Sequence, residues 1–399
     1  EREARMESNA FQQAERALEA GGEQAVFDVL AQTFMQDKDY GKLFQLRVLR
    51  KRFELGLPLI QSGPSEDVPA DKRPDYEKAF VQAAREAGEL FLAENDIPRA
   101  WPYFRAIGEP APVAAAIERT DEHENMAAII EIAYQEQIHP RKGFELILKH
   151  YGICRAISSV FQYPTREGRQ DCIGLLLRSL HRDLLSNLKR TIAQKEEAAP
   201  ETGSISALIA GRGWLFEDNC YYIDTSHVVS VMQYGLELDD PELLGLALEL
   251  AEYGSQLGSM FQRCGNPPFE AFTDYAAYFR AVLDKDVETG IEHFRRKVAE
   301  CDPNEYGTAP AQVLVGLLSR LGRYPEAIRI SMEHLKEVDP NQQACPSVLQ
   351  LCQWAGDFEQ LRKIASEQGD VLSFTAGLLQ ASRPREPQPT KPVVAQSES

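Results

Sequence analysis

The most constraining feature of this sequence is the spacing of small residues, aromatic residues and proline between Ala84 and Pro112. Counted from Gly88, the next such positions follow at offsets of 3, 12, 16 and 24, at Phe91, Ala100, Phe104 and Pro112. Small residues let two antiparallel helices approach closely, and aromatic residues fill the space beside them. Proline is expected to end the unit, because it disfavours helix at the residue before it. The spacing therefore predicts a helix–turn–helix unit.

Related spacing returns twice further along the chain. Residues 125–150 predict a hairpin in the same register, with one gap at Glu131. In LGRYPEAIRISMEHLKEVDP, residues 321–340, the turn and the second helix return at Gly322, Arg323, Tyr324, Glu326 and Ala327. Repeated hairpins of this kind predict an α-helical repeat protein.

These segments resemble tetratricopeptide repeats, although Ser331 replaces the usual aromatic residue, and Asp339 and Pro340 arrive one residue late. The resemblance implies an all-α, superhelical array of antiparallel helical hairpins, a TPR-like α-solenoid with a concave groove for a peptide or a partner helix. The family motif specifies packing and no catalytic residue. Structural roles alone therefore carry over, to Ala87, Gly88, Ala100, Phe104, Gly322 and Ala327.

Helical periodicity and its interruptions predict four regions. We expect an N-terminal helical-repeat array over 1–197, an ordered crossover loop over 198–223 and a C-terminal helical-repeat array over 224–381. The remaining segment, 382–399, is rich in proline and lacks a packable pattern, so we expect it to be disordered.

Charge and cysteine usage restrict the partners and the compartment. The formal net charge is −18, which disfavours nucleic acid and anionic membranes and favours basic partners. Seven scattered cysteines without a CxxC pair are typical of reduced thiols, so we predict a cytoplasmic protein. No stretch reaches the roughly 18 apolar residues of a membrane span. The chain begins at Glu1 rather than Met, which is compatible with a further segment upstream.

The crossover region interrupts the helical pattern with three glycines and a group of aromatic residues. Ordered loops of this length usually carry function or cover an apolar surface. We therefore predict that this loop binds a protein or peptide partner through Arg212, Trp214, Phe216, Tyr221 and Tyr222. A second interpretation makes Arg212 an anion site between Gly211 and Gly213.

An enzyme is the alternative to a binding protein. Asp224 and His227 lie three residues apart across a helix start, and His181 on the preceding long helix is a candidate to complete a hydrolytic or metal-dependent site. The structural interpretation of the same residues is that Asp224 caps the helix and His227 lies on a partly buried face.

A weaker metal hypothesis uses His150 and Cys154, whose i, i+4 spacing puts two ligands on one face of a helix. The common catalytic and phosphate-binding motifs do not occur in the sequence. We therefore predict a non-catalytic helical-repeat scaffold without a cofactor, which holds a protein or peptide partner in its groove. No sequence feature specifies its oligomeric state.

Overall fold

The computed structural model describes residues 2–60, 68–160, 162–163, 165–198, 200–339 and 342–382. Within these ranges the chain is all-α and forms no strand, which confirms the predicted fold class at this level. Extended segments meet there in a single isolated bridge, between Arg263 and Ala271. None of the described helices is both long and apolar enough to cross a bilayer. The predicted disordered tail lies, from residue 383 onward, outside the described residues.

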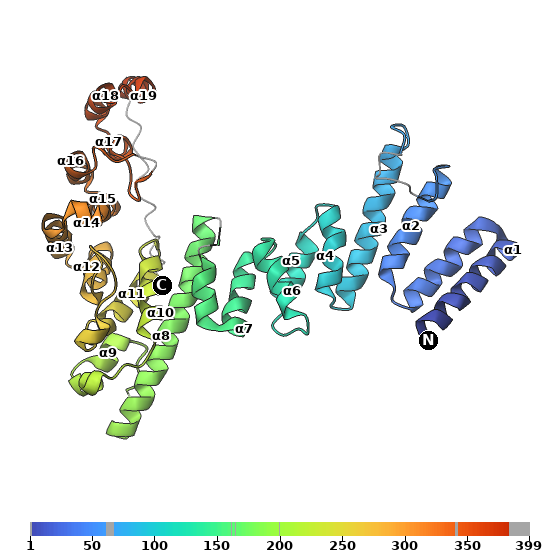
Figure 1. Cartoon of the computed structure of the whole chain (residues 1–399), viewed down its shortest axis with the longest axis horizontal. Helices are drawn as coiled ribbons and strands as arrows, with labels where there is room; N and C mark the ends of the chain where they lie inside the picture. The colour runs from blue at the N-terminus through green and yellow to red at the C-terminus, as the bar shows by residue number, and fades with distance from the viewer. Residues whose placement is uncertain are drawn as a thin grey trace, which may run out of the picture. The chain divides into compact units, whose positions relative to one another are not determined.

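The chain divides into two compact units, Glu1–Cys172 and Ile173–Ser399. The first unit contains α1 (Arg2–Gln36), α2 (Tyr40–Glu54), α3 (Arg73–Ala93), α4 (Ile97–Ala106), α5 (Ala111–Glu118), α6 (Met126–Ile130), the π-helix η2 (Glu131–Gln135) and α7 (Pro140–Val160) (Figure 1). The boundary between the units falls inside α8 (Arg166–Glu196). The boundaries that the sequence predicts for the crossover loop, near 197 and 224, coincide with the end of α8 and the start of α10.

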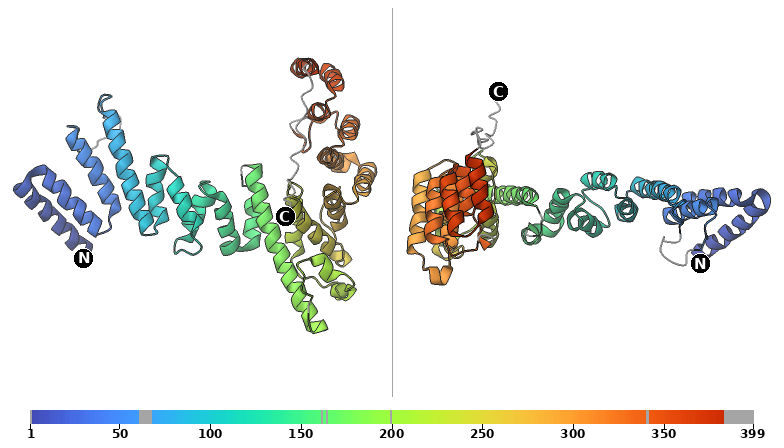
Figure 2. Two further views of the ribbon diagram at one scale, coloured as in Figure 1. Left: turned by 180° about the vertical axis from the view of Figure 1, so that it is seen from behind. Right: turned by 90° about the horizontal axis from the view of Figure 1, so that it is seen from above.

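The second unit continues with short helices and then with paired ones. After α8 come α9 (Ile205–Ile209), η3 (Gly213–Asn219), α10 (Thr225–Gly235), α11 (Pro241–Gly254), η4 (Ser259–Phe261), α12 (Phe272–Val282), α13 (Val287–Glu300), α14 (Pro303–Tyr306), α15 (Ala309–Arg320), α16 (Tyr324–His334), α17 (Val348–Ala355), α18 (Phe358–Glu367) and α19 (Val371–Ala381). From α15 to α19, each helix packs on the next one along the chain (Figure 2).

Aspartate and proline set the starts of many helices. Asp96 caps α4 by accepting a hydrogen bond from the backbone N–H of Arg99 at 3.1 Å, and Pro98 follows within the first turn. Asp240 caps α11 in the same way, directly before Pro241. A side-chain acceptor satisfies an unpaired N–H at the helix start, and proline there loses no hydrogen bond. These local signals explain why the hairpin turns are short.

The close helix contact predicted at Gly88 is confirmed. A Cβ atom on Gly88 would lie 2.6 Å from Cε2 of Phe104, so only glycine leaves room for the ring. Ala84, Ala87 and Ala100 are fully buried around the same contact, and Phe104 has no exposed surface. The antiparallel pair α3–α4 is therefore held by an aromatic ring placed directly against a helix backbone.

Glu131 stands where the repeat register predicts a small residue, at the position that Gly88 takes in the first hairpin. The π-helix η2 begins at this residue. Beyond it, the predicted small position Gly143 lies close to the preceding helix backbone, because its Cβ would lie 2.8 Å from the backbone nitrogen of Tyr134. The hairpin of residues 125–150 therefore has its close contact at the small residue of its second helix.

Three features differ from the sequence interpretation. Pro112 does not end the helix–turn–helix unit of α3 and α4. It lies in the first turn of α5, the helix that follows directly. The last helix, α19, was not anticipated. Both α1 and α7 are broken by glycines with positive φ, Gly22 at 70° and Gly152 at 77°, a conformation that glycine adopts without steric cost.

Replacing Gly88 by alanine should destabilise the first unit, because the new methyl group meets the ring of Phe104. We expect the free energy of unfolding to fall by about 1–3 kcal/mol in a denaturant titration. The matched control is Gly245→Ala in α11, where nothing lies within 4 Å of the added Cβ. That variant should be unchanged or more stable by up to about 1 kcal/mol. Equal effects of the two variants would contradict the packing interpretation.

Candidate functional site

The predicted crossover loop is an ordered segment built from α9 and η3, and its contacts are mainly with α8 and α11. Ile205, Leu208 and Leu215 are fully buried and fix it to the second unit. Ser204 caps α9 by accepting a hydrogen bond from the backbone N–H of Ala207. The segment therefore covers apolar surface of these helices.

Arg212 is committed to contacts within the chain. Its Nε and Nη2 donate to the carboxylate of Glu196 at 3.0 Å, and its Nη1 donates to the backbone oxygen of Leu208, also at 3.0 Å. The hydrogen bond from Arg212 lowers the pKa of Glu196 below its ordinary value. Each terminal nitrogen and Nε thus has an acceptor, so the guanidinium ties the crossover segment to the end of α8 and is not poised for an external anion.

Three of the four predicted aromatic contacts also face inward. The Nζ atom of Lys195 lies 4.0 Å from the centre of the Trp214 ring, in cation–π geometry. Phe216 packs against buried Tyr253, with ring centres 5.8 Å apart. The hydroxyl of Tyr222 donates to the backbone oxygen of Leu215 at 2.8 Å. These side chains explain how the segment is held in place.

Tyr221 is the predicted contact residue that remains most exposed. The residue is 54% exposed, and its ring lies 5.1 Å, centre to centre, from the ring of Phe261. Met260, in the adjacent η4, is 69% exposed. Together these residues form a small apolar patch, which is narrower than the surface that the sequence predicted.

His181 pairs with a carboxylate that the sequence analysis did not consider. Its Nε2 lies 2.6 Å from Oε2 of Glu249 on α11, and the same carboxylate accepts hydrogen bonds from the hydroxyl of Ser204 and the N–H of Ile205. Burial alone would raise the pKa of Glu249, but these hydrogen bonds outweigh it and hold the pKa below its ordinary value. A carboxylate inside the apolar run LGLALELAEYG was the available sequence signal.

This cluster is built for support rather than for nucleophilic chemistry. In an activated serine, the hydroxyl bonds to a base, which a third group orients. Here the carboxylate of Glu249 lies between Ser204 and His181, and each of them bonds to it. Ser204 also caps α9. The arrangement therefore joins α8, α9 and α11.

Asp224 and His227 start α10, as the structural interpretation of these residues proposed. The carboxylate of Asp224 accepts from the backbone N–H of Ser226 at 2.9 Å and from its hydroxyl at 2.6 Å. The hydrogen bond from the Ser226 side chain is the main reason why the pKa of Asp224 is lowered. The structure thus gives His181 and Asp224 different partners, and it does not assemble the three residues around a common ligand.

The geometry assumed for His150 and Cys154 is not present. Gly152 interrupts the helix between them, so the two residues do not share one regular helical face. The Nε2 atom of His150 lies 3.2 Å from the backbone oxygen of Asp121. Across the described ranges, no group of three or more His, Cys, Asp or Glu side chains is arranged to hold a metal ion.

A buried charge cluster at the start of α12 escaped the sequence analysis. Asp274 is only 2% exposed, and its carboxylate accepts from the backbone N–H groups of Glu270 and Ala271, both at 2.8 Å. His293 and Lys297 of α13 contact it at 2.8 and 3.1 Å. Burial would raise the pKa of Asp274, yet these contacts lower it. Because its oxygens are fully used, Asp274 joins α12 to α13 and leaves no open position.

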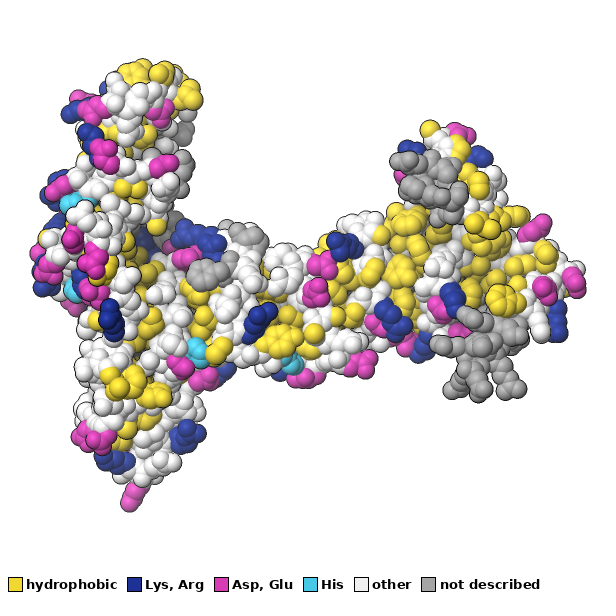
Figure 3. Space-filling model, in the orientation of Figure 1, with side chains coloured by type: hydrophobic (Ala, Val, Ile, Leu, Met, Phe, Trp, Pro, Cys, Tyr) yellow, Lys and Arg dark blue, Asp and Glu magenta, His cyan; other side chains and the backbone are white. Residues whose placement is uncertain are grey.

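The first unit contains two adjoining cavities of about 570 and 560 Å³. Tyr76 and Phe80 line both of them, so the cavities form one groove, which we call the α2–α3 groove. Apolar side chains dominate the larger cavity: Leu30, Phe34, Phe44, Leu46, Val48, Leu49, Leu59, Tyr76 and Phe80. The face of the molecule in Figure 3 shows apolar side chains gathered over α2 and α3.

Aromatic edges organise the wall of this groove. Phe44 meets Phe80 and Tyr103 edge to face, with ring centres 5.4 and 5.2 Å apart. Edge-to-face pairs fix ring positions and leave large apolar surfaces in place. None of the residues that line the larger cavity is acidic, although the chain as a whole carries a net charge of −18. The groove is thus the most apolar concave surface among the described cavities.

Comparison with known proteins identifies no relative: no family model, no curated protein and no solved structure matches this chain. The tetratricopeptide-like character therefore stays a prediction.

The pH dependence of stability should reveal the role of Glu249. Because its pKa is lowered in the folded chain, its ionised form stabilises the fold above the ordinary value of 4.5, and this contribution is lost as the pH falls through the folded value. We expect Glu249→Gln to lower the free energy of unfolding by about 1–2 kcal/mol near neutral pH. The difference from wild type should shrink at acidic pH.

Glu242→Gln is the matched control on the same helix, since Glu242 is 66% exposed in its pair with Arg178. An exposed pair of this kind contributes less than about 1 kcal/mol. A gap between wild type and Glu249→Gln that stays constant from neutral to acidic pH would argue against the proposed role of the carboxylate.

Proposed function

We propose that this chain is a non-catalytic, TPR-like helical-repeat scaffold that binds a protein partner in the α2–α3 groove. The groove itself carries the proposal, because large half-buried aromatic and aliphatic side chains line a concave surface. Interfaces of high affinity depend on such apolar pockets, into which the partner inserts one or two anchoring side chains. The close approach of successive helices at two glycines, Gly88 against the ring of Phe104 and Gly143 against the backbone at Tyr134, supports a solenoid built from hairpins.

The lining favours a segment with apolar anchors, such as one face of an amphipathic helix. Arg52 is almost completely buried, donates from Nε to the backbone oxygen of Pro58 at 2.6 Å and lies over the ring of Tyr76. It therefore shapes the floor of the groove. Lys42 lies on the lining and pairs with Asp39 at 3.1 Å. Because Arg52 is buried and Lys42 is paired, a partner that enters this groove meets mainly apolar surface, and it meets no carboxylate from the lining of the larger cavity.

The contacts of the crossover segment favour a supporting role for it. Four of the predicted contact residues bind α8, α11 or the segment itself through their polar groups and rings: Arg212, Trp214, Phe216 and Tyr222. The enzyme alternative receives no comparable support, because His181 and Asp224 serve separate structural contacts. We therefore place the partner in the first unit.

Leu59→Glu should weaken the capture of the partner from an extract of cells that express the chain naturally. Leu59 lines the groove and is 44% exposed, so the change should leave the fold intact while adding a charge that binding would have to desolvate. We expect a loss of at least about tenfold, which corresponds to roughly 1.4 kcal/mol. Quantitative mass spectrometry of the captured proteins provides the measurement.

Ile60→Glu is the control, because Ile60 is 89% exposed, adjacent in sequence and absent from the groove lining. It adds the same charge and should preserve capture. The proposal fails if both variants retain every partner, or if Tyr221→Ala abolishes capture while Leu59→Glu does not.

A further inference from the structure

A second groove lies at the end of the second unit, between α16, α17 and α18. It has a volume of about 560 Å³, and an adjoining cavity of about 360 Å³ lies between α17 and α19. Ser347 and Leu349 line both cavities, so they are continuous across the start of α17. We call them together the α17 groove. It is formed entirely within the second unit and is separate from the α2–α3 groove.

The larger cavity combines an apolar floor with an acidic rim. Met332, Leu335, Val338, Val348, Leu349 and Ile364 supply the apolar part. The charged lining residues are Glu337, Glu367, Asp370 and Lys336, three acids against one base. Within the described part of the chain, Glu337 and Glu367 form no ion pair, whereas Asp370 caps α19 by accepting from the N–H of Ser373 at 3.0 Å. Two carboxylates of the rim, those of Glu337 and Glu367, therefore lack an ion-pair partner among the described residues.

A neutral acceptor on the same wall also lacks a donor. Gln343 lines the cavity, and its Nε2 donates to the backbone oxygen of Val338 at 3.0 Å. Its Oε1 is buried and has no hydrogen-bond partner in the described structure. Buried polar atoms are nearly always paired in folded proteins, so an orphan acceptor beside a cavity points to a missing donor. The carboxylates of Glu337 and Glu367 and the amide oxygen of Gln343 thus all lack a hydrogen-bond donor or cation as partner among the described residues.

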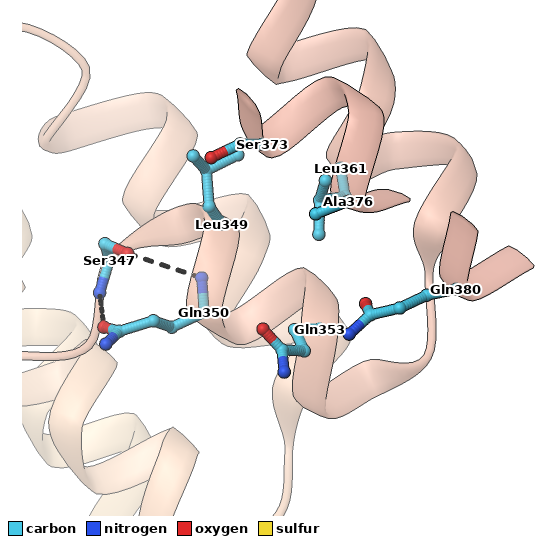
Figure 4. A pocket seen from close by; sticks show the side chains of 8 residues that line it. All are labelled: Ser347, Leu349, Gln350, Gln353, Leu361, Ser373, Ala376 and Gln380. Atoms are coloured by element: carbon cyan, nitrogen blue, oxygen red, sulfur yellow. Dashed lines mark hydrogen bonds between the residues drawn. The ribbon is translucent and has the colours of Figure 1, made fainter. Parts of the chain in front are cut away.

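The adjoining cavity is lined by side-chain amides and hydroxyls without charge. Figure 4 shows Gln380 of α19 extending toward Gln353 of α17, and Leu349, Leu361 and Ala376 supply the apolar part of the lining. Gln350 and Ser347 are engaged in the capping box of α17. Amides offer both donors and acceptors, which is what the backbone of an extended peptide requires.

We propose that the α17 groove binds an extended peptide segment of a partner protein that carries a lysine or arginine next to an apolar residue. The cationic side chain lies against Glu337 and Glu367, the apolar neighbour contacts the half-buried side chains of Met332 and Leu349, and the peptide backbone continues past Gln353. This site does not depend on the function proposed for the first unit. Its charge preference agrees with the net charge of −18, which favours basic partners.

Selection from a phage-displayed library of random short peptides tests this inference on the full-length chain. The library is first passed over beads without protein, which removes phage that bind the beads. Peptides then retained by the wild-type chain are ranked by enrichment. We expect the enriched sequences to contain lysine or arginine beside an apolar residue. Enrichment of peptides without a cationic residue, or of none at all, would overturn the proposal.

A synthetic copy of an enriched peptide then allows the groove to be tested by substitution. The Glu337→Gln/Glu367→Gln double variant should bind it at least about fivefold more weakly at low salt, as expected for the loss of two exposed charge contacts. Glu333→Gln/Glu359→Gln is the matched control, because both residues lie on the same helical hairpins, outside the lining of the groove, and change the net charge equally. Binding to that control should change less than about twofold.

The remaining outcomes also decide the question. Equal weakening by the two double variants would show that only the overall charge matters, and would overturn the assignment to the α17 groove. Loss of the peptide in Leu59→Glu, with retention in the Glu337/Glu367 variant, would place it in the first unit instead. If Leu59→Glu still binds the peptide, the peptide site does not depend on the function proposed for the first unit.

Discussion

The close approach of neighbouring helices is the constraint on which the rest of this structure depends. At Gly88, Gly143 and Gly290 a side chain would meet the adjacent helix at 2.6 to 2.8 Å, so hydrogen alone fits. Because each contact joins elements that are neighbours along the chain, the core is distributed over many local interfaces. Within each unit, apolar residues are thus buried largely between successive helices.

Local packing could be predicted from the sequence, and long-range polar pairing could not. The contact of Gly88 with Phe104 follows from helical spacing, which is visible within a short segment. The pair of His181 and Glu249 joins residues 68 positions apart, and no spacing rule reports it. The α2–α3 groove could not be predicted for the same reason, since its lining comes from four helices, α1 to α4, and from residues between them. Trp214 and Tyr222 were recognised as special, but the sequence did not show that they face inward.

The two grooves show that net charge describes the chain and not its surfaces. An overall charge of −18 predicts a general preference for basic partners. The lining of the larger cavity in the first unit nevertheless contains no acid, while the larger cavity of the α17 groove is lined by three acids and one base. If both grooves are occupied, the two partners differ in chemistry and need not compete. A scaffold with unlike surfaces can hold unlike proteins at one time.

The π-helix at Glu131–Gln135 places one tyrosine against both parts of α7. The backbone of Tyr134 lies against Gly143, before the break of α7 at Gly152. Its buried hydroxyl donates to the backbone oxygen of Ser159, beyond that break, at 2.6 Å. A change at Tyr134 would therefore disturb both parts of α7 at once, although the two parts are separated by a glycine that interrupts the helix.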